Sequence, residues 1–171
     1  TENDLQYYNN SLECICLLLT GKELENGEFA NFIDSLIQSL DVSVENRFFA
    51  KKLDFTIYTQ HHLDDNQLDI LKKYFKNANI IKIDIPEKYD FYNDKTEHQD
   101  LTYGYKSGPN YSFFNTFRYL TMYNTTLFLE CDIFFGENWL ERIFNYCRFS
   151  GSFIISGSTY DGNNFHNIYS D

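Results

Sequence analysis

Short apolar runs alternate with helical stripes along most of this chain, and that alternation constrains its fold more than any other feature. The strand-length runs cover residues 12–20, 54–59, 80–85, 126–131 and 152–156. Apolar residues recur at three- and four-residue steps over 29–40, 64–77, 109–122 and 137–149, which is the spacing of amphipathic helices. Helices alternating with strands that are apolar on both faces predict an α/β fold. We expect a Rossmann-like sandwich with a mainly parallel central sheet.

The length of the chain fits one domain. It has 171 residues and a mass of 20.4 kDa, enough for a single core of ordinary size. We expect a single domain over residues 1–171, with room for more of the same domain beyond Asp171. The polar segment 87–108 predicts a long loop of functional or mobile character. The tail 157–171 shows no visible element.

The charge balance excludes two classes of partner. Lys and Arg number 14 against 25 Asp and Glu, which gives a net charge of −11. This balance excludes a broad basic face that could bind nucleic acid or an anionic membrane surface. A phosphorylated ligand can still bind through a metal ion or backbone N–H groups. No apolar run approaches the length of a transmembrane helix, and we expect a cytoplasmic protein.

The chain has four cysteines, at Cys14, Cys16, Cys131 and Cys147. Cys14 and Cys16 fall on one face of the first predicted strand, so their side chains are neighbours. We interpret all four as buried free thiols of a reducing compartment. A disulfide or a metal site at Cys14 and Cys16 is the alternative.

The predicted sheet places candidate ligand-binding residues at the carboxyl ends of its strands. Ligands of open α/β sheets bind at that edge. The segments concerned are Thr20–Gly21 after the first strand, residues 59–62 after the second, 130–132 after the fourth and 157–161 after the fifth.

The stretch LFLECDIFF, residues 127–135, carries the most chemical information. An apolar strand runs directly into Glu130 and Asp132, which share a face if the chain is extended. Carboxylate pairs at such a place suit a hard divalent cation, Mg²⁺ or Mn²⁺, with open positions for phosphate oxygens. The alternative is that Asp132 caps the following turn while Glu130 pairs with Arg118 or Lys106.

These residues resemble a known family. In LFLECDIFFGENWLERI, the ECD sequence at a strand end and the following helix around Trp139 look like the DxD-type motif of GT-A glycosyltransferases. KSGPNYSFFNTFR at 106–118 and GSTYDG at 157–162 are most similar to small viral members of that family. The resemblance spans residues 12–162 and is specific over 104–162. Glu130 departs from the family by replacing the first Asp, which implies water-mediated metal contact there and direct contact at Asp132.

The resemblance implies a metal-dependent transfer of a sugar from a nucleotide-sugar donor to an acceptor hydroxyl. The implied donor is a UDP-sugar such as UDP-glucose or UDP-rhamnose, and the acceptor is a glycan or glycoprotein. If the protein is viral, its expected location is the host cytoplasm. The residues implied to bind the donor are Thr20, Gly21, Tyr58, Lys106, Ser107, Asn110 and Glu130. An ordinary strand-to-helix turn at Thr20–Gly21 and simple helix capping at 106–110 are the alternatives.

Asp161 is the candidate base that deprotonates the acceptor if the reaction inverts configuration. Its alternative role is a turn residue in Asp161–Gly162, and a retaining enzyme needs no such base. Two other functions are considered. A sugar nucleotidyltransferase normally needs a basic, Gly-rich loop after the first strand, whereas residues 22–25 read KELE. A non-catalytic binding module of the same fold is the third hypothesis.

Overall fold

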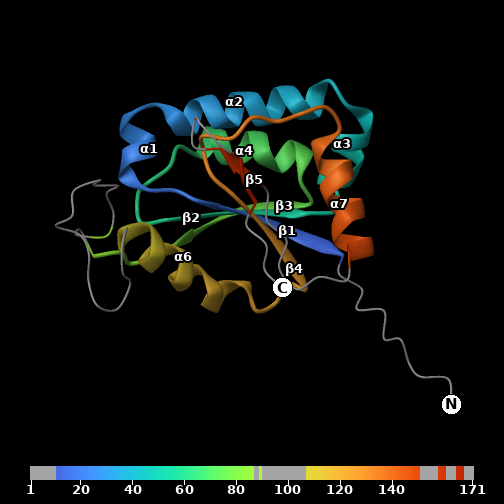
Figure 1. The fold of residues 1–171 in the computed structure, drawn as a ribbon. Coiled ribbons are helices and arrows are strands. Elements are labelled where there is room, and N and C mark those ends of the chain that lie inside the picture. The colour runs from blue at the N-terminus through green and yellow to red at the C-terminus, as the bar shows by residue number, and fades with distance from the viewer. Residues whose placement is uncertain (1–10, 87–88, 90–106, 151–157, 161–164, 168–171) are drawn as a thin grey trace, which may run out of the picture.

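The computed structural model describes residues 11–86, 89, 107–150, 158–160 and 165–167. They form an α/β fold around a four-stranded, entirely parallel sheet with the order β3-β2-β1-β4 (Figure 1). The strands are β1 Leu12–Leu18, β2 Asp54–Thr59, β3 Asn77–Lys82 and β4 Thr125–Leu129. The predicted α/β class and parallel sheet are therefore confirmed.

Helices lie on both faces of this sheet (Figure 1). The helices are α1 Gly21–Glu25, α2 Glu28–Asp41, α3 Val44–Ala50, α4 Asp65–Tyr74, α6 Ser107–Leu120 and α7 Trp139–Ser150. The chain passes from β1 through β2 to β3 with α2 and α4 on one face, then reverses to reach β4. Because parallel crossovers are right-handed, this reversal places α6 on the opposite face. None of the helices in the described ranges is long and apolar enough to cross a bilayer.

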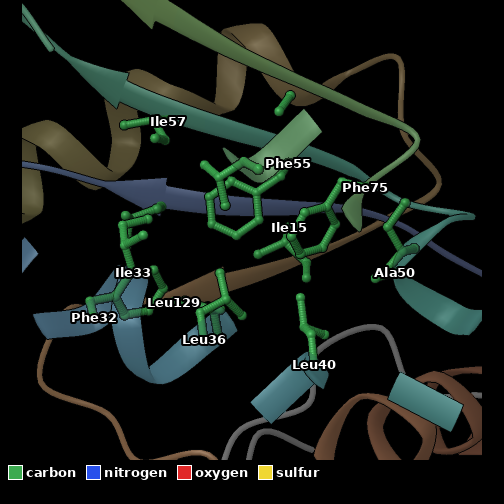
Figure 2. Packing of buried hydrophobic residues seen from close by; sticks show 14 of the residues in the cluster. Ile15, Phe32, Ile33, Leu36, Leu40, Ala50, Phe55, Ile57, Phe75 and Leu129 are labelled. Atoms are coloured by element: carbon green, nitrogen blue, oxygen red, sulfur yellow. The ribbon is translucent and has the colours of Figure 1, made fainter. Parts of the chain in front are cut away.

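The two faces of the sheet bury separate clusters, because side chains alternate along each strand. Ile15 and Phe55 point toward α2, where they meet Leu36 and other aliphatic residues (Figure 2). Cys16 and Tyr58 point the other way, toward α6. The strands are apolar on both faces for this reason, as expected of a covered parallel sheet.

Several predicted boundaries are wrong in informative ways. β3 begins three residues before the predicted 80–85, because polar side chains of its first half bond to β2. Asn77 Nδ2 donates to Asp54 Oδ1 at 2.8 Å, and Asn79 Oδ1 accepts from Thr56 at 2.9 Å. Helix α3 was not predicted, since VENRFFA is too short to show a helical period.

The C-terminal part also differs from the prediction. The tail that showed no visible element contains an antiparallel pair, β5 Ser158–Tyr160 with β6 Phe165–Asn167. Helix α6 starts at Ser107 rather than at Pro109. The predicted fifth strand, 152–156, and most of the predicted loop 87–108 lie outside the described residues.

Candidate functional site at the edge between β1 and β4

The strand order reverses between β1 and β4, so the connections that leave these two strands diverge. Leu17 of β1 pairs with Leu129 of β4. Thr20 therefore lies at the same sheet edge as residues 130–132. Such a divergence at carboxyl ends is where open α/β sheets bind ligands, and it makes this edge the candidate site.

Glu130 and Asp132 are both exposed and flank Cys131, which is buried. The strand ends at Leu129, two residues earlier than predicted, so both carboxylates belong to the turn that follows β4. The alternation of an extended strand, from which the shared face was predicted, therefore ends before these two residues. Burial of Cys131 between them nevertheless leaves both carboxylates on the solvent side.

Two further carboxylates lie near this turn. Burial raises the pKa of the Cys131 thiol, and the negative charges of Glu23, Glu28, Asp132 and Glu130 raise it further. Four acidic side chains from α1, α2 and the turn after β4 thus act on one thiol. The sequence placed only Glu130 and Asp132 here, because nothing local reveals that α1 and α2 start beside the end of β4.

The acidic group is not a complete metal site by itself. Within the described ranges, no three His, Cys, Asp or Glu side chains are arranged to hold an ion together. Mg²⁺ in nucleotide-binding enzymes is commonly held by one or two carboxylates plus substrate phosphates. The carboxylates of Asp132 and Glu130 fit that kind of shared site, in which the phosphate oxygens complete the coordination.

Thr20 and Gly21 form the start of α1. The Thr20 N–H donates to Glu23 Oε2 at 2.8 Å, and the Thr20 hydroxyl donates to the same carboxylate. Thr20 is only 5% exposed. Because both polar hydrogens of Thr20 are engaged by Glu23, the geometry favours an ordinary strand-to-helix turn over a nucleoside-binding role.

Tyr58 lies near the carboxyl end of β2, but its side chain is not exposed at the open edge. Its side chain is fully buried beneath α6, with its ring 5.8 Å from that of Tyr119 between centroids. Its hydroxyl has no hydrogen-bond partner among the described residues. Burial raises the pKa of Tyr58, and the thiols of Cys16 and Cys14 add to the shift. The expectation that Tyr58 faces a nucleotide is therefore corrected.

The N-terminal end of α6 lies at the same sheet edge as the acidic group. Only residues 121–124 join α6 to β4, so the helix runs antiparallel to the strands and begins near their carboxyl ends (Figure 1). Asn110, in the first turn of α6, is half-buried. Ser107 is the first helical residue rather than the preceding cap, and Lys106 and Asp161 lie outside the described residues.

A buried polar network fixes the connection from β4 to α7, and sequence reasoning missed it. The side chain of Asn46 on α3 donates to Ser39 O at 3.2 Å and accepts from Leu140 N at 3.1 Å. Ser43 Oγ donates to Asn138 Oδ1 at 2.8 Å. Asn138 has a φ of 50°, a left-handed conformation that Asn tolerates better than most residues. These contacts hold the chain that follows Asp132 against α2 and α3.

A cavity of about 520 Å³ borders this network. It is lined by residues 39, 42, 43, 45 and 46 at the α2–α3 corner and by residues 135–138. Only residues 51–53 separate α3 from the start of β2, so this corner lies toward the amino ends of the strands. The cavity is therefore separate from the acidic group.

Comparisons with protein-family models, with curated proteins and with solved structures found no match to this chain. The resemblance to GT-A glycosyltransferases therefore depends on the motif residues themselves, and the fold class depends on the structure.

Proposed function

We propose that this chain is a metal-dependent glycosyltransferase that binds a nucleotide-sugar donor at the edge between β1 and β4. The observation that carries the proposal is the exposed pair Glu130 and Asp132 at the carboxyl end of a parallel strand, with Glu23 and Glu28 close by. An acidic edge of this kind would repel a diphosphate unless a divalent cation is bound between the carboxylates and the phosphates.

Asp132 is the proposed direct ligand of Mn²⁺ or Mg²⁺, and Glu130 is proposed to act through a water molecule. The ion would neutralise the charge that develops on the diphosphate as the glycosidic bond breaks. The N-terminus of α6, a helix of 14 residues, faces the same edge and offers backbone N–H groups that favour anions. Cation and helix together supply the positive charge that a chain of net charge −11 otherwise lacks.

The remaining roles follow from the resemblance. The proposed donor is a UDP-sugar and the proposed acceptor is a hydroxyl of a glycan or glycoprotein. Asp161 is proposed as the base if the reaction inverts configuration, and that assignment stays a prediction.

Hydrolysis of a panel of nucleotide sugars, with and without Mn²⁺, tests this function. The expected products are a free sugar and a nucleoside diphosphate, formed only with the metal and lost in Asp132→Asn. Release of a sugar phosphate and a nucleoside monophosphate would indicate a different reaction class. Absence of turnover and of nucleotide binding across the panel would contradict the proposal.

A further inference from the structure

Helix α6 packs Tyr119 and Leu120 against the sheet, but its three phenylalanines are exposed while two of its small polar residues are buried. Ser112 and Thr116 are fully buried, whereas Phe113, Phe114 and Phe117 are 38%, 56% and 43% exposed. A helix that covers a sheet normally has the opposite arrangement. We call Phe113, Phe114 and Phe117 the phenyl patch, and its exposure indicates that another surface covers it.

The phenyl patch is already ordered by contacts between its own rings. The centroids of Phe113 and Phe117 are 4.8 Å apart, and that of Phe113 is 4.9 Å from Phe128 of β4. The patch thus extends from α6 onto β4, one of the two outer strands of the described sheet. Aromatic rings held in place in this way lose little conformational freedom on binding.

The distribution of charge favours a second copy of this chain as the partner. The chain has 25 acidic residues and a net charge of −11, yet neither α6 nor β4 contains an Asp or a Glu. If two copies associated through most other faces, carboxylates of one copy would therefore meet carboxylates of the other. An interface made by α6 and β4 places no carboxylate of these two elements between the copies. A further feature points the same way, because β4 lacks the Lys and Pro residues that protect outer strands from pairing.

We propose that the phenyl patch binds a second copy of this chain. The dimer has two-fold symmetry, so the same patch serves both copies and α6 packs against α6 of the partner. The phenyl rings form the apolar centre of the interface, in the position where binding energy concentrates.

Sedimentation equilibrium over the micromolar range tests the dimer. The expected mass is twice the monomer's 20.4 kDa. Phe114→Glu places a carboxylate on the most exposed ring of the patch and should weaken the dimer about thirtyfold, the effect of losing a central interface contact. The matched control is Phe134→Glu, because Phe134 is 99% exposed in the turn region after β4 and outside the patch. This control should keep the dimer.

Salt provides a second readout. Both copies carry the same net charge, so screening of their repulsion should tighten the dimer as ionic strength rises. A monomeric parent protein throughout the range, including the case in which another segment of the same chain covers the patch, overturns the proposal. So does a dimer that Phe114→Glu and Phe134→Glu weaken equally, provided that circular dichroism shows both variants folded.

Discussion

Asp132 and Glu130 differ by one methylene, and this difference separates their proposed roles. Both are exposed in the turn after β4, so a substitution at either position leaves the core unchanged. The shorter Asp132 side chain holds its carboxylate close to the backbone and suits direct coordination. The longer Glu130 suits contact through water.

The first prediction compares the two carboxylates. Asp132→Asn should weaken Mn²⁺ binding in the presence of UDP by about tenfold or more, roughly 1.4 kcal/mol, and Glu130→Gln should weaken it less. The free Mn²⁺ signal in electron paramagnetic resonance measures this binding. Asp34→Asn, an exposed change on α2, is the control. Equal effects at positions 132 and 34 would refute the assignment.

Tyr58 provides a second prediction at the same scale. Its buried hydroxyl lacks a partner among the described residues, whereas the hydroxyl of Tyr123 donates to Asp54 Oδ2 at 2.8 Å. Tyr58→Phe should lower the free energy of unfolding by less than about 0.5 kcal/mol, or should raise it, because no hydrogen bond to the described residues is lost. Tyr123→Phe should lower it by about 1.5 kcal/mol. Urea denaturation measures both, and a larger loss at Tyr58 than at Tyr123 would show that the Tyr58 hydroxyl is bonded.

Strand β1 places two thiols on its α6-facing side, where both are fully buried. Burial raises the pKa of Cys14 from 9.0 to about 11, against a smaller lowering by its hydrogen bond to Thr56. Burial also raises the pKa of Cys16. The folded protein therefore keeps both thiols protonated at pH values where the unfolded chain releases their protons.

This difference predicts an alkaline loss of stability. Between pH 9.0 and about 11, the unfolded state binds fewer protons than the folded state, so the free energy of unfolding falls as pH rises. The fall continues above pH 11 for groups whose folded pKa is higher still. Urea midpoints measured below and above this window should decrease in the parent and decrease less in Cys14→Ala/Cys16→Val. An identical decrease in both proteins would assign the effect to other groups.

The junction of α2, α3 and α7 depends on one buried amide. Asn46 is 1% exposed and bonds both α2 and the start of α7. Asn46→Ala leaves the partner groups unpaired and should lower the free energy of unfolding by about 2 kcal/mol or more. Thermal or urea unfolding measures the loss. Asn66→Ala, at an exposed position on α4, should stay within about 0.5 kcal/mol of the parent, and a similarly small effect at Asn46 would contradict this role.

At the scale of the whole molecule, the sequence predicted the order of strands and helices because apolar periodicity is a local property. β2 was predicted with its observed bounds, Asp54–Thr59. The bounds of β3 were not predicted correctly, since the side-chain hydrogen bonds of Asn77 and Asn79 to β2 exist only after the strands pair. The reversal that brings β4 beside β1 is likewise a property of topology.

The candidate site was predictable only in part for the same reason. A strand ending in two carboxylates marked Glu130 and Asp132, and sheet geometry indicated the edge. The hydrogen bond from Thr20 to Glu23 and the burial of Tyr58 could not be predicted, because both depend on side-chain directions in the folded protein. The proximity of Glu23 and Glu28 to Cys131 depends on the path of α1 and α2.

The most direct test of the account is calorimetric titration of UDP into the protein with and without Mn²⁺. The acidic edge predicts that Mn²⁺ tightens UDP binding at least about tenfold, because without the cation the negative charges of the carboxylates and of the phosphates repel each other. Asp132→Asn should remove most of this enhancement while Asp34→Asn retains it. Equal UDP affinity with and without Mn²⁺, or no UDP binding in either condition, would contradict the central claim.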